Sequence, residues 1–169
     1  WGDGVILTDY RNTAGRIGNS FKDAGRRHLR IDLQRSMGRD ELLTFDVEGP
    51  GFWLTRDYLP ALLDLDLQIM PRLNDLASEL GEFTSMPIPV PHDCIDGFLG
   101  AYWRRPDMYL DADVRKSMSS FAKIDSEAGL RRLADDLASG AWRTRYGHLL
   151  DREDLDVGYR LLRWDLSPE

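Results

Sequence analysis

Cysteine is almost absent from this chain, and long apolar runs are missing altogether. Cys94 is the only cysteine in 169 residues, which excludes an internal disulfide and a cysteine-rich zinc site. No stretch approaches the roughly 20 apolar residues of a membrane span, and no charged segment followed by an apolar one precedes the first polar turn. A free thiol suits a reducing compartment, so we expect a cytoplasmic protein without a membrane partner.

Basic residues are also in deficit. Lysine and arginine number 22 against 29 aspartates and glutamates, which gives a formal net charge of -7. This excess of negative charge argues against nucleic acid as a principal partner and leaves small polar or amphipathic ligands open. The three histidines, His28, His92 and His148, are too widely spaced to form a metal-ligand motif, so no metal site is expected.

Short apolar runs alternate with segments of helical periodicity. The 42% of hydrophobic residues can bury one sizeable core, so a single domain over 1–169 is expected. Buried strands are expected where apolar residues are bounded by polar or glycine-containing turns. Helices are expected where leucines recur at intervals of three or four. The expected strands are 5–8, 42–45 and 157–164, and the expected helices are 21–33, a broken helix or two helices over 52–80, 111–124, and 126–138.

Residues at the ends of these segments support the limits. Pro60 and Pro71 interrupt the 52–80 segment, because proline breaks a helix interior. Asp125 is the expected N-cap of the helix that follows it, and Gly140 is its expected stop. In the last expected strand apolar and polar residues alternate, which indicates that one face is exposed to solvent and suits the edge of a sheet.

Strands separated by helices are typical of an α/β fold, with a mainly parallel sheet flanked by helices. In such sheets ligands bind in the crevice beyond the carboxyl ends of the strands. Here the expected strand ends fall near Asp9, Asp46 and His92. The sequence therefore predicts one crevice lined by these residues.

His92, Asp93 and Cys94 follow the proline-rich run 87–91, where strand pairing should stop because proline lacks a ladder donor. His92 could be a general base toward a substrate hydroxyl or amine, with Asp93 or Asp96 orienting the imidazole. The same side chains could instead hydrogen-bond the turn and cap a helix that begins near Asp96. A nucleophilic thiolate at Cys94 is a further alternative, although an inert, buried thiol is preferred.

Two segments combine aromatic rings with arginines, and Trp53, Tyr58, Trp103 and Arg104 are the candidate binding residues in them. Such a mixture can enclose a flat or cationic ligand through stacking and cation–π contacts. Core packing is the commoner use of aromatics at helical spacing. Single-stranded nucleic acid also binds such mixtures, but the acidic net charge disfavours it.

Gly15 and Gly18 follow the expected strand 5–8 and resemble the later part of a nucleotide-cofactor glycine loop. If 29–31 is a second short strand, Asp32 stands where an acidic residue grips ribose hydroxyls. The alternative is an ordinary polar loop.

Several segments agree in order, spacing and unusual composition with a known family. They are LLTFD (42–46), GFWLTRDYLP (51–60), VPHDC (90–94), DGF (96–98), AYWRRP (101–106) and LDVGYR (155–160). Together they resemble class I S-adenosylmethionine-dependent methyltransferases of the type 11-like group, over about 42–164.

The resemblance implies an abbreviated Rossmann-like fold. In it, 42–45 corresponds to the fifth strand, 86–90 to the sixth, and 157–163 to an antiparallel seventh strand. These are the substrate-side strands. Residues 41–169 are then methyltransferase-like, and 1–40 replace the family's acidic glycine-rich loop and four leading strands with an atypical segment. The chain begins at Trp1, and we expect either a fragment or a shortened relative whose sheet a partner completes, as in a homodimer.

The function implied is methyl transfer from S-adenosylmethionine to a small-molecule acceptor. His92 would be the base, oriented by Asp93, while Trp53, Tyr58, Trp103 and Arg104 would shape the acceptor pocket. Gly15, Gly18 and Asp32 would hold the cofactor. The alternative is a non-catalytic α/β module that keeps this half of the fold as a binding or assembly surface.

Overall fold

A computed structural model describes residues 34–36 and 39–164 of the chain. The strand expected at 5–8, the helix expected at 21–33 and the crevice residue Asp9 lie outside the described residues.

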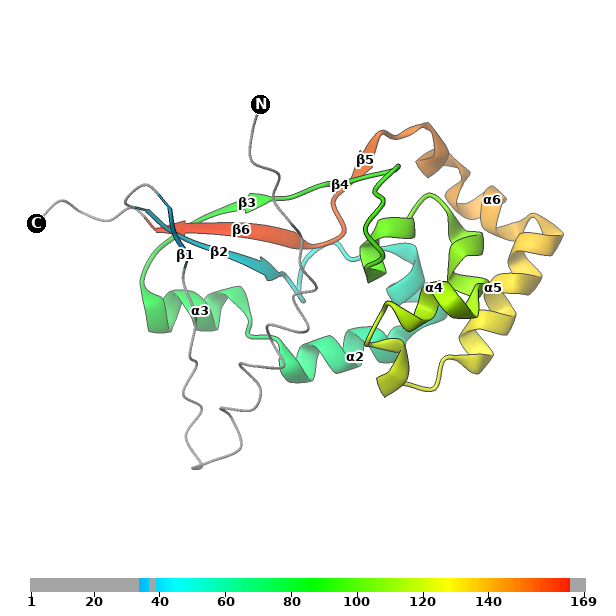
Figure 1. Ribbon diagram of the computed structural model, residues 1–169, viewed down its shortest axis with the longest axis horizontal. Coiled ribbons are helices and arrows are strands. Elements are labelled where there is room, and N and C mark those ends of the chain that lie inside the picture. Colours follow the sequence, from blue (N-terminus) through cyan, green and yellow to red (C-terminus); the bar gives the residue numbers. More distant parts are fainter. Residues whose placement is uncertain (1–33, 37–38, 165–169) are drawn as a thin grey trace, which may run out of the picture.

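The larger sheet joins strands that are distant in sequence (Figure 1). Its order is β1-β2-β6-β3, in which every neighbouring pair is antiparallel. The expectation of a mainly parallel sheet is therefore not confirmed for the part of the chain that the structure describes. The reason is that β6 lies between β2 and β3, so these two strands, which are parallel to each other, never pair directly. The strands are β1 (Gln34–Ser36), β2 (Arg39–Phe45), β3 (Thr84–Pro87) and β6 (Tyr159–Trp164).

The predicted strand 42–45 is confirmed within β2, and the antiparallel last strand is confirmed as β6. Its expected place at a sheet edge is wrong, because β6 is paired on both sides. Six residue pairs align β2 with β6, from Asp40 opposite Trp164 to Phe45 opposite Tyr159.

The run expected to form one strand at 86–90 is divided between two sheets. After β3, the amide of Ile88 still donates to the carbonyl of Tyr159, at 2.9 Å. The prolines at 87 and 89 then prevent continuous pairing, since proline offers no N–H. The chain resumes as β4 (Val90–Pro91), which forms a two-stranded antiparallel ribbon with β5 (Asp154–Leu155). His92 thus follows the ribbon and not the larger sheet.

The segment between β2 and β3 is helical, as predicted, and is broken twice. A short π-helix (Leu54–Tyr58) leads into α2 (Pro60–Ile69), where Pro60 occupies the first turn that tolerates it. Pro71 separates α2 from α3 (Leu73–Leu80). The two prolines therefore mark boundaries and not kinks within one helix.

The later helical region is only partly as expected. In place of a helix over 111–124 there is α4 (Ala112–Lys116), which ends early and is followed by a 3₁₀ turn (Phe121–Lys123). Helix α5 (Glu127–Ser139) confirms the next predicted helix, and Gly140 ends it at φ 80°. The predicted N-cap is wrong by one residue, because Ser126 is the N-cap, although the side chain of Asp125 accepts from the amide of Glu127. Helix α6 follows (Ala141–Tyr146). Further 3₁₀ turns are Leu99–Tyr102, Pro106–Leu110 and Gly147–Asp151.

Two apolar clusters hold these elements together. The smaller one joins α3 to the sheet, through Leu76, Leu162 and Trp164. The larger one fills the helical half of the molecule and is unusually rich in aromatic rings. Figure 1 shows the sheet on one side with α3 beneath it, α4, α5 and α6 on the other side, and α2 beneath the region between them. The candidate functional site lies at the junction between sheet and helices.

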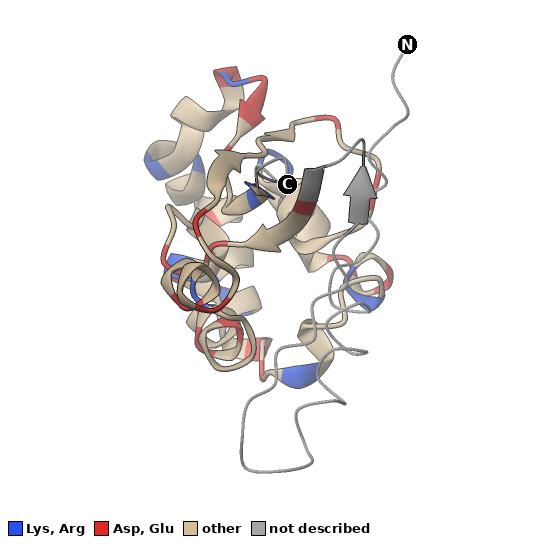
Figure 2. Cartoon of the chain, turned by 90° about the vertical axis from the view of Figure 1, so that its left-hand side faces the viewer, with Lys and Arg blue, Asp and Glu red and all other residues tan. Residues whose placement is uncertain are grey.

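Among the described residues, no helix combines the length and apolar character that crossing a membrane requires. Acidic residues occur throughout the view of Figure 2, with basic residues interspersed among them.

Candidate functional site

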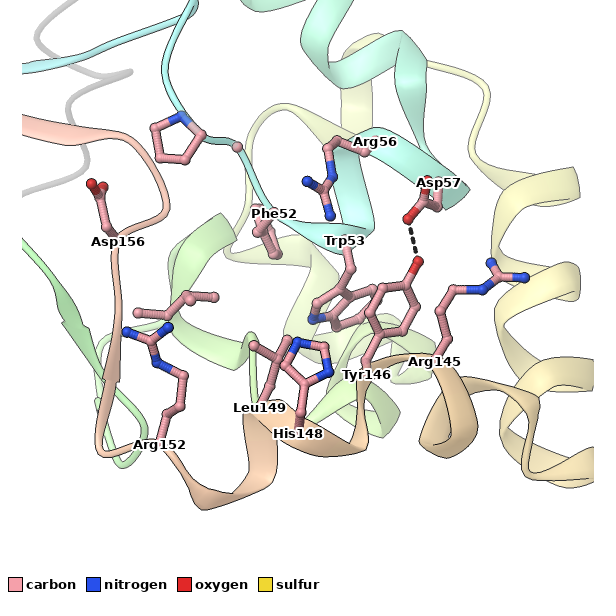
Figure 3. A pocket seen from close by; sticks show the side chains of 13 residues that line it. Phe52, Trp53, Arg56, Asp57, Arg145, Tyr146, His148, Leu149, Arg152 and Asp156 are labelled. Carbon is pink, nitrogen blue, oxygen red and sulfur yellow. Dashed lines mark hydrogen bonds between the residues drawn. The ribbon is translucent and has the colours of Figure 1, made fainter.

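A hollow of about 600 Å³ opens beside the carboxyl end of β2 (Figure 3). The chain leaving β2 contributes one wall, through residues 50–53 and the start of the π-helix, and the chain entering β6 contributes another, through Leu155 and Asp156. Its third wall comes from the end of α6 and the 3₁₀ turn after it. This is the end of the sheet at which α/β proteins place ligands. The lining residues are Pro50, Gly51, Phe52, Trp53, Arg56, Asp57, Arg145, Tyr146, His148, Leu149, Arg152, Leu155 and Asp156.

A shared arginine ties the two strand ends together at this hollow. Arg160, at the start of β6, donates to Asp156 at 2.7 Å and lies 3.6 Å from the carboxylate of Asp46. The amide of Asp46 in turn donates to the carbonyl of Gly158, at 2.8 Å. Gly158 has φ 115°, and a Cβ there would stand 2.7 Å from the ring of Phe45. Only glycine therefore allows this close turn. Asp46 directly follows β2, at the strand end that the sequence predicted.

Asp57 and Tyr146 form a hydrogen-bonded pair in the wall of the hollow. The hydroxyl of Tyr146, which is buried, donates to Oδ2 of Asp57. Burial is the first cause that raises the pKa of Tyr146, and the hydrogen bond to Asp57 is the second. The contact with Tyr146 also raises the pKa of Arg145, whose guanidinium lies 5.8 Å from the centre of that ring. The tyrosine is therefore held as a neutral donor to Asp57.

The rim of the hollow is cationic. Arg56 extends from the π-helix toward Phe52 and Trp53, and Arg152 enters from the turn that precedes β5 (Figure 3). Within the part of the chain that the structure describes, no carboxylate pairs with either guanidinium, nor with the imidazole of His148. Both acidic residues of the lining already have partners, because Asp57 accepts from Tyr146 and Asp156 from Arg160.

The predicted binding residues Trp53 and Trp103 lie in the core beneath this site. Trp53 is 1% exposed and Trp103 is 0% exposed. The indole of Trp103 donates to the carbonyl of Val90 at 2.9 Å, and that of Trp53 donates to the carbonyl of Trp103 at 2.8 Å. Both rings therefore serve the packing role that the sequence left open, and Trp53 alone of the two also borders the hollow.

The other two predicted binding residues have structural partners. Tyr58 is buried, and its hydroxyl donates to Asp136 of α5 at 2.6 Å. Burial, reinforced by Asp136, raises the pKa of Tyr58. Arg104 donates to the backbone carbonyl of Arg152 at 2.9 Å. Neither residue lines the hollow, but Arg104 holds the segment that carries Arg152.

The predicted catalytic residues lie beside the hollow and not within it. His92 is 33% exposed, and its Nε2 stands 3.2 Å from a carboxylate oxygen of Glu153. Glu153, and not Asp93, is therefore the acidic partner of the imidazole, while Asp93 is exposed. Cys94 is a half-buried free thiol. The expected helix near Asp96 is wrong, because the next helical turn begins at Leu99 and has no side-chain cap.

The predicted cofactor residues Gly15, Gly18 and Asp32 lie outside the described residues. Over 34–36 and 39–164, no group of three or more histidine, cysteine, aspartate or glutamate side chains could hold a metal ion.

Sequence reasoning missed several residues of the hollow, namely Arg56, Asp57, Tyr146, His148 and Arg152. The sequence does indicate the neighbourhood of the first two, which belong to the segment 52–58 that combines aromatic rings with an arginine. The others lie about 90 residues further along the chain, in turns without a recognisable pattern. Only the folded chain brings these parts together.

The matched part of this chain has the fold of a known structure. No protein-family model matches the chain, and comparison with curated proteins gives no match either. It is similar to a crystal structure from Anabaena variabilis ATCC 29413, described as a "putative methyltransferase from antibiotic biosynthesis pathway". The identity is 37% and the TM-score 0.66, over 76% of this chain and 55% of that one. The chain thus spans about half the length of that protein, and this likeness supports a methyltransferase fold for the part that matches.

Proposed function

We propose that this chain is the substrate-side part of a class I S-adenosylmethionine-dependent methyltransferase, type 11-like, acting on a small-molecule acceptor. The likeness to the Anabaena variabilis protein carries the proposal, because 37% identity is well above the level at which only a fold is shared. The hollow beyond the carboxyl end of β2 adds support, since this is where the fold class places ligands.

We assign the hollow to the acceptor and not to the cofactor. S-adenosylmethionine supplies, when bound, a methyl group on a positively charged sulfur. A rim that carries Arg56 and Arg152 would not favour a second cation close by. Cofactor contacts from Gly15, Gly18 and Asp32 belong to this proposal and fall in the segment outside the described residues.

The catalytic role of the chain would be to hold the acceptor in line with the methyl group, because proximity and orientation supply most of the acceleration in such a transfer. His92 stays the proposed base, with the carboxylate of Glu153 3.2 Å from its Nε2 as the orienting group and Asp93 next to it. Trp53 supports the floor of the acceptor site. Tyr58, Trp103 and Arg104 would act from behind it, by holding its walls.

The test is a calorimetric titration of the chain with S-adenosylmethionine, with adenosine as the matched ligand that lacks the methionine part. Saturable binding of S-adenosylmethionine that is tighter than that of adenosine supports the proposal. Absence of heat at millimolar ligand contradicts it and favours the second candidate, a non-catalytic α/β binding or assembly module. That candidate is supported by the limited extent of the match, because the chain spans only 55% of the similar protein.

A homodimer is a further proposal, because an open sheet edge can pair with another chain. The β3 edge is poorly suited, since Pro87 and Pro89 remove N–H donors along it. Pairing would then use the β1 side of the sheet. We also propose a cytoplasmic location, which rests on Cys94 being a free thiol.

A further inference from the structure

The unpaired cations of the hollow indicate what kind of ligand it accepts. The chain as a whole carries a net charge of -7, yet three arginines and two aspartates line the hollow. A cleft lined by one sign of charge concentrates the field and attracts ligands of the opposite sign. The excess of arginine over aspartate in the hollow is therefore opposite in sign to the net charge of the chain.

The two aspartates do not cancel that excess. The carboxylate of Asp156 is bound at 2.7 Å by Arg160, which does not line the hollow and also lies 3.6 Å from the carboxylate of Asp46. The carboxylate of Asp57 accepts the hydroxyl of Tyr146. Arg145 lies against the ring of Tyr146, on the far side of that ring from Arg56 in Figure 3. The guanidinium groups without a carboxylate partner are those of Arg56 and Arg152, although Nε of Arg152 donates to the carbonyl of Asp154 at 3.2 Å.

The remaining wall is apolar and aromatic. Phe52, Trp53 and Leu149 are buried core residues that show one edge to the hollow. A flat apolar group that packs against them would lie in the same hollow as Arg56 and Arg152. Arginine forms planar, two-pronged hydrogen bonds with carboxylate and phosphate, which a neutral group cannot match.

We propose that this hollow binds a small molecule that carries an acidic group, a carboxylate or a phosphate, on an aromatic or otherwise apolar body. Arg56 and Arg152 bind the acidic group, and Phe52, Trp53 and Leu149 contact the apolar body. That this ligand is the methyl acceptor rests on the proposed function, but the binding itself does not.

The test is a calorimetric titration of the chain, without S-adenosylmethionine, using benzoate, phenyl phosphate and the uncharged benzamide. We expect saturable binding of at least one acid, weaker binding when salt is added, and no saturation by benzamide over the same range. Tighter binding of benzoate would assign the site to a carboxylate, and tighter binding of phenyl phosphate would assign it to a phosphate. Equal binding of benzamide, or no binding of either acid, would overturn the proposal.

Variants separate the two arginines from a general charge effect. Arg56→Gln and Arg152→Gln should each weaken binding of the preferred acid by roughly three- to tenfold, as expected for a charged hydrogen bond at a partly open site. Arg143→Gln removes the same charge from an exposed position of α6 outside the hollow and should leave the affinity unchanged. Equal losses in all three variants would contradict the assignment, and the melting temperature shows that each variant is folded.

The outcome is separable from that of the proposed function. Acid binding without S-adenosylmethionine binding would keep this site and remove the methyltransferase proposal. The reverse result would keep the proposed function and remove the acidic ligand.

Discussion

Arg160 joins two acidic side chains that come from different strand ends. It is 11% exposed, donates to Asp156 at 2.7 Å and lies 3.6 Å from Asp46. Without it, two carboxylates would face each other at the junction of β2 and β6 with no cation between them. The arginine therefore stabilises the wall of the hollow and the sheet at the same point.

Arg160→Gln should lower the free energy of unfolding by about 2 kcal/mol, because it leaves half-buried carboxylates without their charged donor. Urea denaturation followed by tryptophan fluorescence measures this change. Arg163→Gln is the matched control on the same strand, where a more exposed pair with Glu41 should contribute less than about 1 kcal/mol. Losses of similar size in both variants would show that the Arg160 network has no special role.

Three tyrosines set the response of the fold to alkaline pH. Burial raises the pKa of Tyr109, Tyr58 and Tyr146, and carboxylates of Asp136 and Asp57 add to the effect for the last two. In the unfolded chain these hydroxyls lose their protons near the ordinary value of about 10. Above that pH the folded chain keeps protons that the unfolded chain has lost.

The stability these tyrosines contribute is therefore complete below about pH 10 and falls as the pH rises further. Urea denaturation at about pH 8 and about pH 11 should show a smaller fall in Tyr109→Phe than in the parent chain, because phenylalanine cannot ionise. The comparison must be made within each chain, since Tyr109→Phe also loses a 2.6 Å hydrogen bond to the carbonyl of Leu99 at both pH values. A fall of the same size in both chains would contradict the prediction.

Side-chain identity alone did not reveal which residues would meet at the site. The segment with Arg56 and Asp57 was recognised from its mixture of aromatics and arginines, but Tyr58 and Trp53 were the residues chosen from it. A π-helix over Leu54–Tyr58 turns Tyr58 into the core and leaves Arg56 exposed at the hollow. The direction in which each side chain points depends on this local geometry, which composition does not encode.

Helix α5 packs closely against the end of the π-helix at Gly129. A Cβ on Gly129 would stand 2.2 Å from the carbonyl oxygen of Tyr58 and 2.5 Å from a methyl group of Leu59. Arg132, one turn further along α5, donates to the carbonyl of Asp57. The same helix thus fixes the backbone that carries Asp57 at the hollow.

Gly129→Ala should lower the free energy of unfolding by about 1–3 kcal/mol through overpacking, although alanine has the higher helix propensity by roughly 0.5–1 kcal/mol. Asp135→Ala, at an exposed position of α5, is the control and should be neutral or slightly stabilising. Thermal unfolding by circular dichroism measures both changes. A stabilised Gly129→Ala protein would show that α5 does not press on the π-helix.

Elements with strong local signals were predicted well. The two prolines set the limits of α2 and α3, and Gly140 ended α5 as expected. The pairing of strands was predicted poorly, because β6 inserts between β2 and β3 by contacts more than 70 residues apart in sequence. The division of 86–90 between two sheets follows from its prolines, but the partner of each half depends on β5 and β6.

For the whole molecule, the site lies where the sheet meets the helical half. The sheet supplies the walls through the chain leaving β2 and the chain entering β6, and the aromatic core supplies the floor. The sequence predicted an α/β chain and a ligand site beyond a strand end, and its resemblance to methyltransferases agrees with the likeness to the Anabaena variabilis protein. The hollow lies beside the chain leaving β2, and His92 is not among its lining residues.

The most direct test is a titration of the ¹⁵N-labelled chain with whichever of benzoate and phenyl phosphate binds more tightly, followed by amide chemical shifts. The account predicts saturable shifts concentrated at 50–57 and 145–156, the segments that border the hollow. Arg143→Gln, at an exposed position outside the hollow, should leave the affinity obtained from these shifts unchanged. Saturable shifts centred on another region, or no saturable shifts at all, would contradict the claim that the hollow beside β2 is the ligand site.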